Sequence, residues 1–165
     1  MYDIEIKNAA ILDGLGNEPY QGNIYVKDGR IVVITHEDTY DASVSLDASG
    51  KIVTPGFIDL HTHSDISFLL DSTAQSKIRQ GVTLELIGNC GLSLCAPLIG
   101  DARDMFDTWV SDHTDSYNPT WTDYAGYIEA SRKSKATLNI AFQIGHASLR
   151  LAVMGQDDSS RTADA

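Results

Sequence analysis

Alternating apolar and polar residues mark the first 53 residues of the chain. The runs YDIEIKNAAIL and NIYVKDGRIVVI are separated by the stretch DGLGNEPYQG, and Asp28 and Gly29 form a turn signal inside the second run. Period-two alternation bounded by glycine, proline, asparagine and aspartate indicates β-strands joined by turns. We therefore expect residues 1–54 to form a small β domain.

The pattern changes after Pro55 and Gly56, where apolar runs become nearly continuous. Three such runs predict buried strands: FIDLHTH at 57–63, VTLELIG at 82–88 and TLNIAFQIG at 137–145. Buried strands of this kind are typical of parallel sheets, which are covered on both faces.

Two helical candidates lie between these strands. Residues 72–81 begin at Ser72, which can cap a helix, and residues 123–135 follow Thr122, which can do the same. A longer excursion, 97–121, carries acidic and aromatic residues. Strands alternating with helices predict an α/β fold with a parallel sheet in residues 55–165.

Residues with metal-binding side chains stand at the end of each predicted strand. His61 and His63 end the first strand, Cys90 follows the second and His146 follows the third. Residues two apart in a strand point to the same face, so the two imidazoles are expected to converge. Neutral imidazoles are good metal ligands, and in parallel α/β barrels the chemistry gathers at the carboxyl ends of the strands. The three strand ends therefore predict a metal site, whereas the plainer alternative is that the histidines only cap a strand.

Composition limits the classes of partner. The 165 residues carry a formal net charge of −11, with a pI near 4.6. Nucleic acid and anionic membrane surfaces repel such a chain, so we expect neither as a partner and infer a small-molecule substrate.

No run approaches the roughly 20 apolar residues of a membrane helix, and the N-terminus lacks the pattern of a signal peptide. A cytoplasmic location is therefore expected.

Three stretches together resemble a known family. VTPGFIDLHTHSD, QGVTLELIGNCGLSLCAPL and IGHASLRLAVMG are similar to the amidohydrolase superfamily and, within it, to the N-acyl-D-amino-acid deacylases (D-aminoacylases). The first motif indicates only the superfamily, and the cysteine in GNCGLS narrows the resemblance to the deacylases. The resemblance implies that residues 55–165 are the first three β/α units of a TIM-like (β/α)8 barrel. It also implies that residues 1–54 belong to a composite β-sandwich that later strands complete.

The resemblance implies a role for several residues. His61, His63 and Cys90 match the family's metal ligands, which hold one or two zinc ions, and a thiolate suits this task because it is anionic and soft. The implied reaction is hydrolysis of a non-peptide amide bond of an N-acyl-D-amino acid by metal-activated hydroxide. Cys95 has no counterpart in the site and is expected to pack in the core.

The chain departs from the family at the later positions. Further histidine ligands and the aspartate that acts as general base and acid match none of the 165 residues, so no catalytic residue is assigned, and the general base is expected beyond Ala165. A complete barrel takes at least roughly 200 residues. We therefore expect the chain alone to be an inactive or incomplete fragment that associates through an open barrel edge.

Other candidates have a functional and a plainer interpretation. His146 at the predicted rim, and Arg150, which can hold a carboxylate through two hydrogen bonds, are candidates for substrate binding. Asp65 is a candidate for orienting a ligating histidine by accepting a hydrogen bond from the ring N–H that does not face the metal. The plainer interpretations are a structural hydrogen bond for His146, a surface salt bridge for Arg150 and solvation at the strand end for Asp65. Trp109, Tyr117 and Trp121 are expected to pack, with a lid over an apolar acyl group as the alternative.

Two functions from other classes remain open. Cys90 is a possible nucleophile in a metal-free acyl-transfer enzyme, activated by a nearby histidine. Alternatively the chain is a catalytically dead fragment that acts only as an interaction partner. Metal content and sensitivity to chelators separate these possibilities from the metal-dependent hydrolase.

Overall fold

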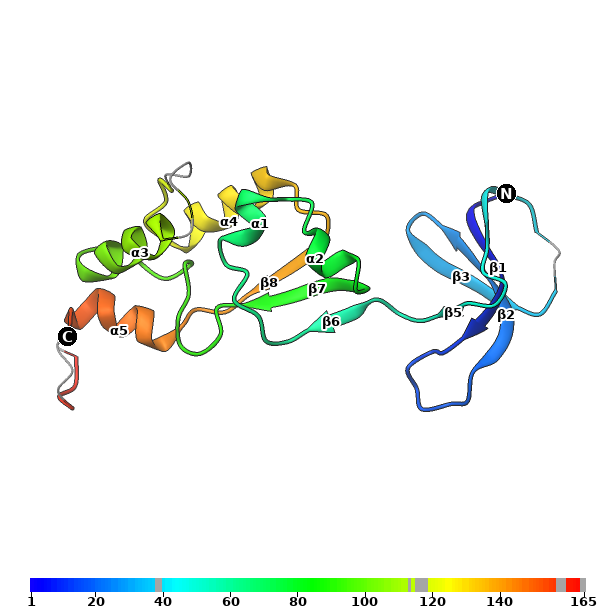
Figure 1. Cartoon of the computed structure of the whole chain (residues 1–165), viewed down its shortest axis with the longest axis horizontal. Coiled ribbons are helices and arrows are strands. Elements are labelled where there is room, and N and C mark those ends of the chain that lie inside the picture. Colours follow the sequence, from blue (N-terminus) through cyan, green and yellow to red (C-terminus); the bar gives the residue numbers. More distant parts are fainter. Residues whose placement is uncertain (38–39, 113, 115–118, 157–159, 164–165) are drawn as a thin grey trace. The chain divides into compact units, whose positions relative to one another are not determined.

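The structure is a computed structural model that describes residues 1–37, 40–112, 114, 119–156 and 160–163 (Figure 1). The chain divides into two compact units, Met1–Pro55 and Gly56–Ala165. Each unit has its own sheet, and each is described by itself below. No helix among the described residues is long and apolar enough to cross a membrane.

The first unit is a mixed five-stranded sheet. Its strands are β1 (Tyr2–Ile11), β2 (Tyr20–Lys27), β3 (Arg30–Thr35), β4 (Ala42–Asp47) and β5 (Ile52–Val53). The order is β3-β2-β1-β4, with β5 also paired to β1. Strands β1, β2 and β3 are antiparallel neighbours, whereas β4 and β5 run parallel to β1. The predicted strands and the turn at Asp28 and Gly29 are confirmed.

Alternation along β1 and β2 gives this sheet two different faces. One face buries a small apolar cluster of Ala9, Ile11, Ile24 and Ala48. On the other face the fully buried Tyr25 donates a hydrogen bond of 2.6 Å to the carboxylate of Glu5. A buried carboxylate needs such partners, so this contact fixes the pairing of β1 with β2.

The second unit is built on a three-stranded parallel sheet in the order β6-β7-β8. Its elements are β6 (Phe57–Asp59), α1 (Ser67–Leu70), α2 (Gln75–Ile78), β7 (Val82–Ile87), α3 (Asp101–Ser111), α4 (Tyr124–Ser134), β8 (Asn139–Phe142) and α5 (His146–Met154). The predicted parallel α/β sheet is confirmed. Its three strands form no closed barrel within the part of the chain that is described.

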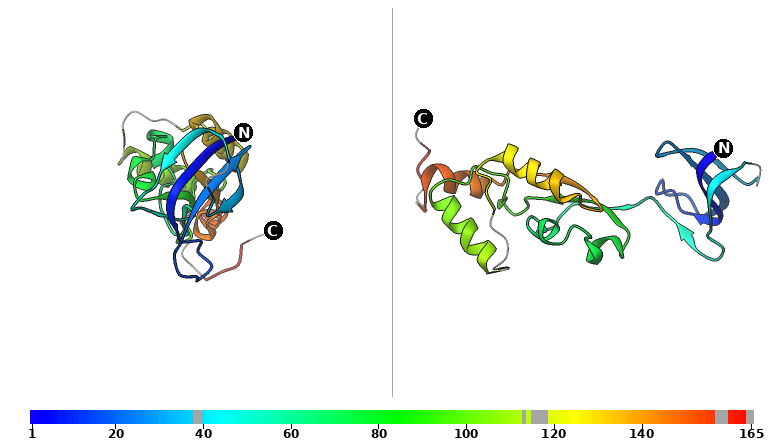
Figure 2. Two further views of the ribbon diagram at one scale, coloured as in Figure 1. Left: turned by 90° about the vertical axis from the view of Figure 1, so that its right-hand side faces the viewer. Right: turned by 90° about the horizontal axis from the view of Figure 1, so that it is seen from above.

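Helices α1, α2 and α4 lie on one face of the parallel sheet (Figure 1). There Phe68 of α1, Tyr127 of α4 and Ile87 of β7 share one buried core. Ile58 points away from that face by strand alternation and is 60% exposed. Among the described residues this second face therefore keeps apolar side chains in contact with water, while α3 and α5 pack against each other (Figure 2).

Several predicted element boundaries are wrong, each for a local reason. Strand β6 ends at Asp59, so His61 and His63 lie in the loop after the strand. In place of a helix over 72–81 there is the single turn of α2, which starts after Ala74 with a left-handed φ of 44° and without the predicted cap.

Helices α3 and α5 also depart from the sequence prediction. Helix α3 occupies much of the excursion, and α5 begins at His146; no helix was predicted for either segment. At the start of α4 the cap is Asp123, whose carboxylate accepts a 2.8 Å hydrogen bond from the N–H of Gly126, rather than Thr122.

Candidate metal centre

Three side chains converge beyond the carboxyl ends of β6 and β7. One ligand atom each of His61, His63 and Cys90 lies within 4.8 Å of the others, and all three residues are exposed. The closest pair is His61 Nε2 and Cys90 Sγ, 3.2 Å apart. The two imidazole rings are tilted by 67° relative to each other, with centroids 5.7 Å apart.

The loop that carries the two histidines is held from behind by Lys77 of α2. The Lys77 ammonium lies 2.8 Å from Asp59 Oδ2 and donates a 3.0 Å hydrogen bond to Thr62 Oγ1. Asp59 in turn accepts a hydrogen bond from the backbone N–H of His61. Lys77 also forms a 3.0 Å ion pair with Glu85, whose side chain is 1% exposed. This cluster fixes the backbone on both sides of His61.

These charged groups shift one another's pKa values. The hydrogen bond from Lys77 lowers the pKa of Asp59, and the N–H of His61 adds to the effect. Partial burial by itself lowers the pKa of Lys77, but hydrogen bonds and charge from Asp59 and Glu85 outweigh it and raise the pKa overall. Lys77 is therefore a permanent cation under the histidine loop.

The loop that carries Cys90 has an unusual backbone. Gly88 and Gly91 have φ values of 83° and 79°, and Cys90 between them has a φ of 56°. This left-handed region costs a non-glycine residue roughly 1–2 kcal/mol. Such strain in a non-glycine residue often marks a functional position, which makes it an independent reason to consider Cys90 a site residue.

Asn89 joins the two loops. Its side-chain amide donates hydrogen bonds of 2.7 Å to the carbonyl of Leu86, at the end of β7, and 3.2 Å to the carbonyl of Thr62, between the two histidines. One buried side chain therefore sets the distance between the histidine loop and the cysteine loop.

The start of α5 supports the cysteine loop from the other side. Ser93 accepts a 2.8 Å hydrogen bond from the N–H of Gly145, and the hydroxyl of Ser148 accepts one of 2.9 Å from the N–H of Ser93. The N–H of Ser148 donates to the carbonyl of Gly91. A Cβ at Gly145 would lie 2.2 Å from that carbonyl oxygen, so the close approach requires glycine.

Asp65 lies two residues beyond His63 and is 4% exposed. Burial raises the pKa of its carboxyl group. Hydrogen bonding to the backbone N–H groups of Gly88 and Leu94 opposes this effect only in part, so the pKa stays above its ordinary value. The carbonyl of Asp65 accepts a hydrogen bond from the Tyr127 hydroxyl, which ties the histidine loop to α4.

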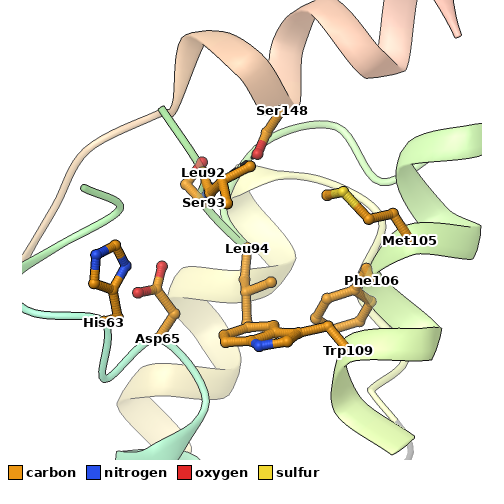
Figure 3. Close-up of a pocket in the computed structure, with 9 residues that line it drawn as sticks. All are labelled: His63, Asp65, Leu92, Ser93, Leu94, Met105, Phe106, Trp109 and Ser148. Atoms are coloured by element: carbon orange, nitrogen blue, oxygen red, sulfur yellow. Dashed lines mark hydrogen bonds between the residues drawn. The ribbon is translucent and has the colours of Figure 1, made fainter. Parts of the chain in front are cut away.

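A pocket of 280 Å³ lies beside the three converging residues (Figure 3). Its apolar lining consists of Leu92, Leu94, Met105, Phe106 and Trp109. Its polar lining consists of His63, Asp65, Ser93 and Ser148. Figure 3 shows His63 and Asp65 on one side and the side chains of α3 on the other.

Trp109 and Trp121 of the excursion therefore differ in role. Trp109 lines this pocket, whereas Trp121 is 6% exposed, belongs to the core and donates a hydrogen bond to the carbonyl of Leu94. Tyr117 lies outside the described residues.

His146 and Arg150 line a different hollow. They are one turn apart on α5 and line a hollow of 430 Å³ together with Leu149 and Val153. Neither lines the pocket beside His63, and His146 is not among the three residues whose ligand atoms converge. Arg150 donates to the sulfur of Met154 at 2.9 Å. The described residues thus bring together the two histidines and the cysteine, but not these two.

Cys95 differs from Cys90 in its exposure and its surroundings. It is 1% exposed, its thiol donates to the carbonyl of Gln143, and burial raises its pKa. Cys95 therefore packs in the core and is not a candidate ligand.

The converging residues suit a zinc ion. Two imidazoles and a thiolate are typical zinc ligands, and tetrahedral zinc places a sulfur and a nitrogen ligand about 3.6 Å apart. The observed Nε2–Sγ distance of 3.2 Å is close to this value, so the three donor atoms fit a zinc ion.

The supporting residues were not found by sequence reasoning. Lys77, Asn89, Ser93 and Ser148 are ordinary polar residues in the sequence, and Ser93 and Ser148 are 55 residues apart. The one local signal was the density of glycines around Cys90, which indicates an unusual backbone.

Comparison with known families classifies the chain. Residues 45–165 match the amidohydrolase family. The chain belongs to this family, whose members are hydrolytic enzymes.

Individual relatives define the resemblance more closely. An N-acyl-D-glutamate deacylase and a D-aminoacylase of Alcaligenes xylosoxydans xylosoxydans are 35% and 36% identical to the chain over 92% and 93% of its length. A crystal structure of the N-acyl-D-glutamate deacylase of Bordetella bronchiseptica, complexed with zinc and a phosphonate inhibitor, has a TM-score of 0.82 and is 36% identical over 98% of the chain. The resemblance to the D-aminoacylases is thus confirmed. The chain spans 30%, 31% and 33% of the lengths of these three proteins.

Proposed function

We propose that the protein is a zinc-dependent hydrolase that cleaves the amide bond of N-acyl-D-amino acids, with His61, His63 and Cys90 as metal ligands. The observation that carries this proposal is the convergence of these three side chains within 4.8 Å on loops braced from both sides. The relatives named above support the choice of substrate class. Because the chain spans about a third of their length, the activity is proposed for the natural-length polypeptide.

Each residue of the proposed centre has a distinct task. Bound zinc supplies Lewis acidity, which polarises a carbonyl group and acidifies water. His61 and His63 present nitrogen lone pairs, and Cys90 supplies the single negative charge of the set. Asp65 is proposed to hold His63 in orientation as a neighbouring acceptor, a task that its burial beside that residue in the same pocket supports.

His146 and Arg150 are proposed to contact the substrate. Arg150 has the planar donor group that suits a substrate carboxylate. Their position one turn apart, in one hollow and on the helix whose start braces the Cys90 loop, supports this role.

The parallel sheet is proposed to be the first three β/α units of a (β/α)8 barrel. Three parallel strands in sequential order, with helices between them and the candidate ligands beyond their carboxyl ends, support this arrangement. The further metal ligands and the general base are proposed to come from later units.

One observation also fits the metal-free alternative. The 3.2 Å contact between His61 Nε2 and Cys90 Sγ is the geometry of a cysteine nucleophile with its base. In that enzyme a chelator would leave activity intact. In a catalytically dead interaction partner there would be neither zinc nor hydrolysis.

The test compares two cysteine variants of the natural-length protein. We expect Cys90→Ala to lower zinc affinity at least about 100-fold and to abolish hydrolysis of N-acyl-D-amino acids, because the only anionic ligand of the three is lost. Zinc content is measured by metal analysis after dialysis, and hydrolysis by release of the free amino acid.

Cys95→Ala is the matched control, because Cys95 is buried in the core and lies outside the three converging residues. It is expected to keep the zinc and the activity. Full zinc content in Cys90→Ala would remove Cys90 from the centre. Activity that survives complete removal of metal would replace the proposal by the nucleophile mechanism.

A further inference from the structure

We propose that the 280 Å³ pocket beside His63 binds the apolar acyl chain of the substrate and selects acyl groups longer than acetyl. This inference rests on the proposed function, because it names the part of an N-acyl-D-amino acid that the pocket receives. The pocket touches the proposed centre directly, since His63 belongs to both.

The chemistry of the walls favours a hydrocarbon chain. Met105, Phe106 and Trp109 project from α3, and Leu92 and Leu94 come from the loop that follows Cys90 (Figure 3). Small-molecule sites are typically apolar with a few polar groups at one end, and here those groups include His63 and Asp65. An acyl group in this pocket would therefore have its hydrocarbon end against α3 and its carbonyl end at the proposed centre.

The charges near the pocket exclude the substrate's carboxylate. The described residues that line it include no lysine or arginine and do include the acid Asp65. An anionic group would be desolvated there without a cationic partner, which is unfavourable. The uncharged acyl end is thus the part of the substrate that fits.

The volume of the pocket indicates how long an acyl chain it can hold. A volume of 280 Å³ lies close to the roughly 300 Å³ at which small-molecule pockets begin, and far above the roughly 30 Å³ that one water molecule takes up in the liquid. One acetyl methyl group would leave most of the apolar wall uncovered. Several methylene groups would cover it, each strengthening binding by about fourfold.

The experiment measures binding without hydrolysis. Natural-length protein is depleted of metal, and the Kd values of N-acetyl-D-alanine and N-hexanoyl-D-alanine are determined by calorimetric titration. We expect the hexanoyl compound to bind at least about tenfold more tightly. Trp109→Ala and Met105→Ala are each expected to reduce that preference at least about threefold, because each removes part of the apolar wall.

Two further variants complete the test. Leu92→Phe adds volume at a pocket-lining residue that is 48% exposed, so it is expected to weaken hexanoyl binding while leaving acetyl binding unchanged. Tyr124→Ala removes a 43% exposed aromatic ring from α4, which does not line the pocket, and is expected to change neither Kd.

The outcomes separate the pocket from the reaction. A hexanoyl preference that is absent, or that Trp109→Ala, Met105→Ala and Leu92→Phe all leave unchanged, overturns the acyl pocket even if the zinc-loaded protein hydrolyses its substrates. A preference that these variants alter supports the pocket. If zinc-loaded protein then hydrolyses neither compound nor other N-acyl-D-amino acids, the proposed function fails while the binding site stands.

Discussion

Single residues decide whether the cysteine loop can reach the histidine loop. Cys90 holds a left-handed backbone conformation that is unfavourable for its residue type, and the hydrogen bonds of Asn89, Ser93 and Ser148 keep the loop in place. The strain is thus balanced by contacts from β7 and α5 rather than relieved within the loop. A change that weakens those contacts should therefore be felt at the Cys90 thiol.

The variant Gly145→Ala tests this support. Its new Cβ would meet the carbonyl oxygen of Gly91 at 2.2 Å, so the loop and α5 must separate. We expect a loss of about 1–3 kcal/mol in the free energy of unfolding and an about tenfold weaker zinc affinity. Denaturant unfolding and metal titration of the natural-length protein measure the two effects.

Gly29→Ala is the control for this prediction. Gly29 has a φ of 71° in the β2–β3 turn, with open space around its Cα, so alanine there is strained without meeting another atom. It is expected to cost stability by about 1 kcal/mol and to leave zinc affinity unchanged. Equal zinc affinities for Gly145→Ala and the natural protein would contradict the proposed support.

At the scale of residues, the sequence predicted the ligands better than their surroundings. His61, His63 and Cys90 have side chains with distinctive chemistry, and their spacing after apolar runs indicates strand ends. The contacts that position them join residues far apart in sequence, such as Gly145 with Ser93. No local pattern of polar residues encodes such a pairing, so only the folded chain reveals it.

At the scale of elements, strands were predicted more accurately than helices. The parallel strands lie in short runs of mostly apolar residues, which indicate a strand even where its exact ends are not evident. Helices α1 and α2 are single turns of four residues, too short for a helical period to be visible. What α2 contributes is one residue, Lys77, between the histidine loop and β7.

Replacing Lys77 by methionine tests the importance of this element. The variant leaves the carboxylate of Glu85, 1% exposed, without its cationic partner and removes the hydrogen bonds to Asp59 and Thr62. We expect the free energy of unfolding to fall by about 3 kcal/mol, because an unpaired buried charge is strongly unfavourable. Urea unfolding of the natural-length protein is the measurement.

Lys133→Met is the matched control. Lys133 forms an ion pair with Glu129 one turn earlier on α4, and its side chain is 74% exposed. Exposed pairs of this kind contribute at most about 0.5 kcal/mol. If the two lysine variants lost the same stability, Lys77 would not be the support that its contacts indicate.

At the scale of the whole molecule, each unit exposes large apolar side chains. In the first unit Ile31 and Ile52 are 63% and 65% exposed, and in the second unit Ile58 and Leu60 are 60% and 67% exposed. Apolar strand residues left in water promote association between chains. We expect the isolated 165-residue polypeptide to associate or to fold loosely, as the sequence also predicted.

Light scattering and thermal unfolding of the 165-residue polypeptide measure this directly. Association is expected to grow with protein concentration, and the melting transition to be broad. A monomer with a sharp, cooperative melt would contradict the prediction.

The proximity of His61 and Cys90 also has a consequence for the chain's entropy. The two residues are 29 positions apart in sequence and 3.2 Å apart in space. A metal ion bound to both would close the β6-to-β7 connection into a loop, as a disulfide bond does. In the chain-entropy model, a cross-link of this loop length stabilises the folded state by roughly 3–4 kcal/mol. The proposed zinc ion would therefore stabilise the fold as a cross-link, in addition to its role in the reaction.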